Sequence, residues 1–239
     1  MPRQLRTIQP GIIYHVTQRG VDRQRVFFID GDRRTYLALM RTNLADAGVS
    51  VQAWCLMNNH VHWMVRPERE DSLAVLFRRV HGRYAQYLNA RKGRSGHLWQ
   101  NRYFACAVDG GHCRNALRYV ELNPVRAGIA VRPADYRWSS ARQHLFGPGA
   151  ADHPCVLDWS IWHELGGETG WRELLGREEA LAEVLALRRC TYAGKPYGTR
   201  EFVSEMEARF GRKWRVPGRP RKPAGREKGT EQPASVSLA

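Results

Sequence analysis

The sequence predicts an α+β fold in which helices cover one face of a single antiparallel sheet. Strand-like apolar segments alternate with segments of helical periodicity through the first half of the chain. Two of the strand-like segments follow each other closely, as the strands of a hairpin do. The chain has 239 residues, 43% of them hydrophobic, so it can bury one good-sized core and carry an appendage.

A strand, a helix and a hairpin are predicted first. Residues 12–17 are rich in β-branched and aromatic residues and predict a strand. A helix is expected from Asp30 or Asp32, either of which can cap it, to Gly48, because the apolar residues between them follow helical spacing. The two strands of the hairpin are predicted at 49–55 and 60–66.

A helix, a strand and a second helix follow. An amphipathic helix is predicted from Asp71 or Ser72, with apolar residues on one face and arginines on the other. Residues 103–108 predict the fourth strand, and residues 112–123 a helix that ends at Pro124, which lacks a backbone donor. This order of elements is that of a ferredoxin-like sheet.

Charge indicates the class of partner. The chain carries 38 Lys and Arg against 23 Asp and Glu, a formal net charge of +15, which favours a polyanion, nucleic acid before an anionic membrane surface. Its five cysteines form no CxxC pair, so neither a zinc knuckle nor a disulfide framework is indicated. With no signal peptide or membrane-spanning stretch in the sequence, we expect a soluble protein of the cytoplasm, associated with the nucleoid.

Two histidines are the candidate metal ligands. Side chains alternate along a strand, so His60 and His62 share one face, which suits a divalent ion, although both could be ordinary half-buried strand residues. A third ligand and a reacting group are expected from Tyr119 and Asn123, one helical turn apart. A phenol is a weak nucleophile until its proton is removed or a metal ion activates the phosphodiester.

Basic segments with interleaved aromatic residues are candidates for nucleic-acid binding. Residues 91–104 combine cations with rings that can stack on bases, although Trp99 could equally be a core residue. The basic tail from Gly211 contains a Gly-Arg-Pro segment similar to a minor-groove-binding AT-hook, or is a solvated disordered tail. The candidate nucleic-acid-binding residues are Arg19, Arg23, Arg94, Trp99, Arg102, Arg126, Lys213, Arg215, Arg219 and Arg221.

Several motifs in this order resemble those of the REP-associated tyrosine transposases, members of the HUH endonuclease superfamily related to single-tyrosine insertion-sequence transposases. The motifs are Asn58-Asn59-His60-Val61-His62, then Gly-His-Leu-Trp-Gln-Asn-Arg at 96–102, Arg-Tyr-Val-Glu-Leu-Asn-Pro-Val-Arg-Ala-Gly at 118–128 and Tyr-Arg-Trp-Ser-Ser at 136–140. The resemblance covers residues 8–146 strongly and the basic tail more loosely.

The resemblance implies a metal-dependent single-strand DNA nickase and strand-transferase that acts on hairpin-bearing DNA. It implies that His60 and His62 bind Mg²⁺ or Mn²⁺, that Asn123 completes the metal site, and that Tyr119 becomes linked to the 5′ phosphate. Imidazole ligands favour Mn²⁺ at least as much as Mg²⁺. The alternatives are a catalytically silent protein that binds hairpin DNA and regulates, and an RNA-binding module. A replication initiator or plasmid relaxase is disfavoured, because the sequence shows neither a second nearby tyrosine nor an ATPase domain.

The predicted organisation is a catalytic domain at 1–146, a helical accessory region at 147–210 and a basic, disordered tail at 211–239, in a monomer or a homodimer. Within the accessory region one helix is predicted near Glu173 to Arg189, and another is predicted to be capped by Thr199.

Overall fold

The computed structural model describes residues 8–150 and 157–214, so Arg215, Arg219, Arg221 and the AT-hook-like segment lie outside the described residues. One antiparallel sheet has the strand order β2-β3-β1-β4, which is the ferredoxin-like order and confirms the predicted fold class. The strands are β1 (Ile13–Arg19), β2 (Val49–Leu56), β3 (His60–Pro67) and β4 (Phe104–Val108).

Two long helices cover one face of this sheet, as predicted: α1 (Asp30–Ala47) and α2 (Ser72–Lys92). They pack on each other and bury the paired rings of Trp54 and Trp63, whose centroids lie 6.0 Å apart across β2 and β3. Helix α1 ends at Gly48, which has a φ of 61° and donates its N–H to the carbonyl groups of Ala45 and Leu44. A left-handed glycine closes a helix in this way.

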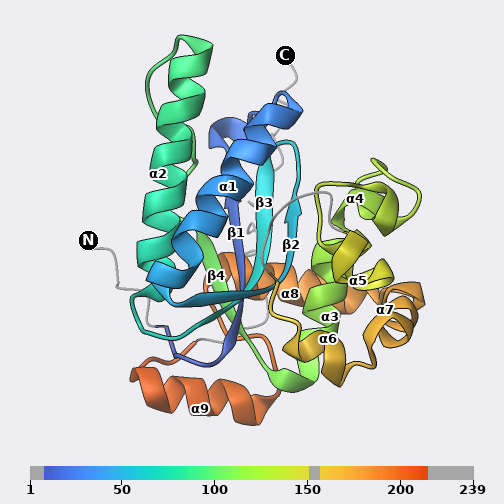
Figure 1. Ribbon diagram of the computed structural model, residues 1–239. Coiled ribbons are helices and arrows are strands. Elements are labelled where there is room, and N and C mark those ends of the chain that lie inside the picture. Colours follow the sequence, from blue (N-terminus) through green and yellow to red (C-terminus); the bar gives the residue numbers. More distant parts are fainter. Residues whose placement is uncertain (1–7, 151–156, 215–239) are drawn as a thin grey trace, which may run out of the picture.

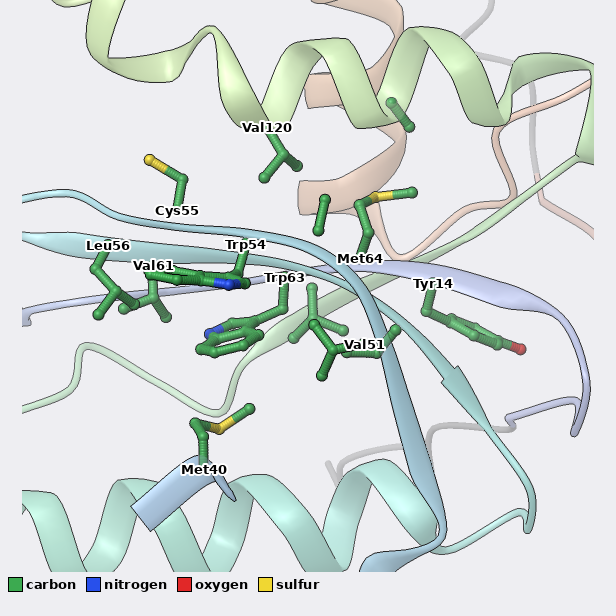
Figure 2. Packing of buried hydrophobic residues seen from close by; sticks show 14 of the residues in the cluster. Tyr14, Met40, Val51, Trp54, Cys55, Leu56, Val61, Trp63, Met64 and Val120 are labelled. Carbon is green, nitrogen blue, oxygen red and sulfur yellow. The ribbon is translucent and has the colours of Figure 1, made fainter. Parts of the chain in front are cut away.

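The opposite face is covered too, which differs from the prediction of helices on one face only. Helix α3 (Gly110–Glu121) lies over β2, β3 and β1 with Val120 buried against them, whereas Met40 of α1 lies on the other side of the sheet (Figure 2). The physical reason is that the strands are apolar on both faces: Cys55 and Met64, which lie on the α3 side, are fully buried.

The accessory region consists of short helices that lie beside α3 and below the lower ends of the strands in the view of Figure 1. The predicted helix from Glu173 to Arg189 is wrong, because α7 ends at Gly176 and α8 begins at Leu181. Thr199 caps α9 as predicted, its hydroxyl accepting a bond from the N–H of Phe202 at 3.2 Å. The remaining helices are α4 (Asn123–Arg126), α5 (Ala141–Phe146), α6 (Ser160–Glu164), α7 (Gly167–Gly176), α8 (Leu181–Ala193) and α9 (Arg200–Phe210).

The segment 136–140 covers the open edge of the sheet. The Tyr136 hydroxyl donates to the carbonyl oxygen of Leu56 at 2.7 Å, and Ser140 exchanges bonds with the backbone N–H and carbonyl of Trp54. Because an uncovered edge strand can pair with another chain, these bonds protect β2.

Among the described residues, no helix has the length and hydrophobicity that a membrane crossing requires.

Candidate active site

The two candidate ligand histidines begin strand β3 and project toward α3. Their ring centroids lie 4.9 Å apart, His62 is 3% exposed and His60 is half-buried. Strand alternation places Val61 between them on the other face, as the sequence predicts. Two imidazoles at this separation can bind one ion together.

The surroundings keep these rings neutral. Burial lowers the pKa of His60 to about 3 and that of His62 well below the ordinary value, and the nearby guanidinium of Arg19 lowers both further. Burial also lowers the pKa of the neighbouring His15 to about 3. A neutral imidazole keeps a lone pair, which is the form that binds a metal ion.

Each histidine has a partner for its Nδ1 atom. Nδ1 of His60 lies 2.6 Å from the amide oxygen of Asn59, and the amide nitrogen of Asn59 donates to the carbonyl oxygen of Arg23 at 3.0 Å. Nδ1 of His62 lies 2.8 Å from Nε2 of His15 on the adjacent strand β1. These contacts leave the Nε2 atoms of both candidate ligands outside the hydrogen bonds described.

Helix α3 places Tyr119 against this pair. The Tyr119 ring meets His62 edge-on at 5.6 Å between centroids and His15 at 5.5 Å, and its side chain is largely buried. Burial raises the pKa of Tyr119, and the guanidinium of Arg126, 4.3 Å from the ring centroid, opposes that rise. The candidate nucleophile is therefore a protonated phenol beside a cation.

Asn123 begins α4, directly after the chain leaves α3 at Leu122. Its amide nitrogen donates to the carbonyl oxygen of Tyr119 at 2.9 Å and to that of Val120 at 3.3 Å. The nitrogen is thereby occupied, and the amide oxygen is the Asn123 atom that could bind a cation.

The donor types suit a divalent ion with mixed nitrogen and oxygen ligands, and the contacts described join Asn123 to Tyr119 and Val120 and not directly to the histidines. The described residues contain no group of three or more His, Cys, Asp and Glu side chains that could hold a metal. Two neutral imidazoles and one amide oxygen would hold Mn²⁺ or Mg²⁺ only if water or substrate oxygens completed the coordination, as an open catalytic site requires.

Sequence reasoning missed the contribution of α8 to this site. Thr191 bonds to His15, and the Tyr192 hydroxyl accepts a bond from Arg19 at 2.9 Å. Glu179, just before α8, pairs with Arg126. No local pattern marks Thr191 and Tyr192, because they follow their partners His15 and Arg19 by more than 170 positions, and Glu179 follows Arg126 by 53.

The candidate nucleic-acid-binding residues that the structure describes fall into three groups. Arg19 and Arg126 lie at the histidine and tyrosine cluster, whereas Arg23, Arg102 and Lys213 are exposed. Arg94 and Trp99 form the third group and are partly buried: Arg94 bonds to Asn89 of α2 and to Gln24, which follows β1, and the Trp99 indole N–H donates to the carbonyl oxygen of His81 at 3.1 Å.

Trp99 packs among aromatic rings, which agrees with the alternative of a core role. Its ring centroid lies 4.7 Å from that of His81 and 6.1 Å from that of Tyr84. A cavity of about 790 Å³ lies between α2 and residues 96–103, and Arg78, Arg102 and Trp99 contribute to its lining.

Comparisons with known proteins show which family and which solved structures the chain is similar to. Residues 9–123 match the family described as "Transposase IS200 like". A solved structure of a REP-associated tyrosine transposase bound to a REP hairpin is similar in fold, with a TM-score of 0.52, 18% sequence identity and coverage of 66% of this chain and 93% of that chain. A crystal structure of a putative transposase from Deinococcus radiodurans R1 matches at a TM-score of 0.36 and 16% identity over 53% of this chain and 97% of that chain. No curated protein matches the chain significantly.

Proposed function

Residues 9–123 match the family of IS200-like transposases, and from that match we propose that the chain cuts and rejoins single-stranded DNA through a tyrosine. The substrate is hairpin-bearing DNA, and the intermediate is a 5′-phosphotyrosine link. The solved relative of similar fold is bound to a REP hairpin, and the net charge of +15 on this chain suits such a polyanion.

One observation carries the proposal: the Tyr119 ring, on α3, lies edge-on 5.6 Å from the His62 ring, on β3. Two separate elements thus bring a phenol and a pair of neutral imidazoles together. In this proposal the Tyr119 oxygen attacks the scissile phosphorus and loses its proton to solvent. The bond from phosphorus to the 3′ oxygen breaks, and the leaving 3′ oxygen takes up a proton. The reverse reaction rejoins a strand.

His60, His62 and the amide oxygen of Asn123 would hold Mn²⁺ or Mg²⁺. Such an ion polarises a phosphodiester oxygen and stabilises the charge that develops on it. The chain's own contribution is to keep both imidazoles neutral by burial and to fix the phenol beside them. We also propose that Arg19 at the site and the exposed Arg23 and Arg102 bind phosphates of the DNA.

The domain organisation is proposed as well: the catalytic domain ends near residue 146. The protein would act on the nucleoid as a monomer or homodimer.

The test is incubation of the full chain with hairpin-bearing single-stranded DNA and Mn²⁺, followed by a denaturing gel. We expect a covalent protein–DNA adduct that Tyr119→Phe abolishes, with hairpin binding retained. The control is Tyr192→Phe, which removes the nearby phenol that bonds to Arg19 and should leave an adduct. DNA cleavage that persists in Tyr119→Phe would contradict the proposal.

A second candidate is a regulatory protein that binds hairpin DNA without cutting it. It is favoured by the burial of Tyr119, which is 7% exposed and whose pKa is raised, because such a phenol is a poor nucleophile. Tight, salt-sensitive binding with no nicking in Mn²⁺ would support this candidate over the first.

A further inference from the structure

We propose that His15 and Thr191 are positioning residues for His62: together they fix its ring in the tautomer whose Nε2 atom is unprotonated. The inference rests on the proposed function only for the role of that nitrogen, which is to bind the metal ion. The residues come from three elements, β1, α8 and β3, and all three side chains are at most 3% exposed.

The Thr191 hydroxyl sets the direction of the hydrogen bonds. It donates its one hydrogen to the carbonyl oxygen of Leu187, one turn earlier in α8, at 2.8 Å. A carbonyl oxygen can only accept, so the hydroxyl hydrogen is committed there. Nδ1 of His15 lies 2.8 Å from the same hydroxyl oxygen and must therefore be the donor in that contact.

The assignment of donor and acceptor on His15 determines the assignment on His62. A neutral imidazole has one donor nitrogen and one acceptor nitrogen, so an Nδ1–H on His15 makes its Nε2 an acceptor. Nε2 of His15 lies 2.8 Å from Nδ1 of His62, and the two ring planes are nearly parallel, at 8° to each other. His62 must then donate through Nδ1–H, and its lone pair is on Nε2.

These hydrogen bonds from His62 through His15 to Thr191, here called the relay, also exclude His15 as a metal ligand. Both of its ring nitrogens are used, one by Thr191 and the other by His62. Of the three histidine rings that contact one another through His62, His60 and His62 keep a nitrogen for an ion.

His60 is held in the same tautomer by a different partner. The Asn59 amide nitrogen donates to the carbonyl oxygen of Arg23, which orients the amide so that its oxygen faces Nδ1 of His60. That oxygen accepts from Nδ1–H and leaves Nε2 of His60 unprotonated. A metal-binding histidine commonly donates its second ring N–H to a fixed acceptor in this way.

The assignment makes α8 part of the metal site. Thr191 follows His15 by 176 positions and belongs to the accessory region, outside the segment 9–123 that matches the transposase family. The catalytic fold by itself would leave the Nδ1–H of His15 without its acceptor. The accessory region therefore determines which nitrogen of His62 is available.

The first test needs neither metal nor DNA. Long-range ¹H–¹⁵N correlation spectra of the imidazoles of the full chain at pH 7 report which ring nitrogen carries the hydrogen, and His62→Gln assigns the signals. We expect His62 and His15 to be protonated at Nδ1. Protonation of His62 at Nε2 would overturn the inference, because it requires every bond of the relay to run the other way.

The second test removes the hydroxyl. Thr191→Val keeps the shape of the side chain and should give His62 a mixture of tautomers, while Thr191→Ser should restore the single one. The matched control is Thr42→Val, since the Thr42 hydroxyl makes the same bond to the carbonyl four residues earlier, that of Ala38, but faces no histidine.

The third test measures the effect on metal affinity, by titrating the protein with Mn²⁺ and detecting binding by electron paramagnetic resonance. The dissociation constant should rise about 10-fold in Thr191→Val, the lower end for a residue that orients a ligand, and stay at the parent value in Thr191→Ser and Thr42→Val. Unchanged tautomers and unchanged affinity in Thr191→Val would overturn the relay. A parent chain with the expected tautomers that binds no Mn²⁺ would contradict the proposed function and leave the relay standing.

Discussion

The guanidinium of Arg126 lies over the ring of Tyr119, 4.3 Å from its centroid, and donates to the carbonyl oxygen of the same residue. Arg126 is fixed from the other side by Glu179. Arg126 is therefore positioned to stabilise the phenolate form of Tyr119, against the burial that disfavours it.

Replacing Arg126 should make Tyr119 harder to ionise. Burial raises the pKa of Tyr119 and the Arg126 charge lowers it, so Arg126→Met should raise that pKa further. The pH profile of adduct formation, measured at saturating DNA, should move to higher pH. Arg126→Lys keeps a cation and should stay closer to the parent. Superimposable profiles for Arg126→Met and the parent would show that this charge does not act on the nucleophile.

Glu121 should contribute to stability rather than to chemistry. This fully buried carboxylate accepts from His144 at 2.6 Å, from Trp171 at 2.7 Å and from Ser140, joining α3, α5 and α7. Glu121→Gln puts an NH₂ group opposite a donor, which should cost about 1–3 kcal/mol in urea unfolding.

The matched control for Glu121 is Glu205→Gln. Glu205 pairs with Arg209 at 2.8 Å and both side chains are exposed, so its loss should cost less than about 1 kcal/mol. Equal stabilities of Glu121→Gln and the parent chain would contradict a structural role for this network.

His81 should make the fold less stable in acid. Burial lowers the pKa of His81 to about 3, below the ordinary value of 6.5. Between these values the unfolded chain binds a proton that the native ring excludes, so the free energy of unfolding falls as the pH falls below 6.5. In His81→Gln the slope should be shallower by up to about 1.4 kcal/mol per pH unit.

Urea unfolding between pH 7 and pH 5 checks this prediction. His97→Gln, in an exposed loop, is the control and should follow the parent chain. A slope for His81→Gln as steep as the parent's would mean that the native ring takes up the proton.

Arg102 should contribute to DNA affinity without sequence preference. It is exposed and lies on the loop that borders the cavity beside α2. If it binds one phosphate, Arg102→Gln should weaken hairpin binding and reduce the slope of log affinity against log salt by about one. Arg132→Gln is the control, because Arg132 is also exposed but is paired with Asp135. Equal salt slopes for Arg102→Gln and the parent would exclude a phosphate contact.

The sequence predicted what depends on local periodicity. Alternation along a strand placed His60 and His62 on one face, and the order of strands and helices predicted the ferredoxin-like sheet, which is confirmed. Helical spacing placed Tyr119 and Asn123 one turn apart, where a bond now joins the Asn123 amide to the Tyr119 carbonyl.

Contacts between distant segments could not be predicted. His15 has the pattern of an ordinary strand residue until Thr191, 176 positions later, is brought against it. The break between α7 and α8 was missed because apolar residues continue through both helices and no proline marks the loop. Which face α3 would cover depends on the apolar character of both faces of the sheet, and periodicity within one helix does not report it.

The most direct measurement is to locate the DNA on the protein. After reaction with hairpin DNA and Mn²⁺, nuclease and trypsin digestion should leave a nucleotide on the peptide from Tyr119 to Arg126, released by cleavage after Arg118 and Arg126. Mass spectrometry should find the phosphate on Tyr119. A nucleotide found instead on the peptide from Cys190 to Arg200, which contains Tyr192, would contradict the assignment of Tyr119 as the nucleophile.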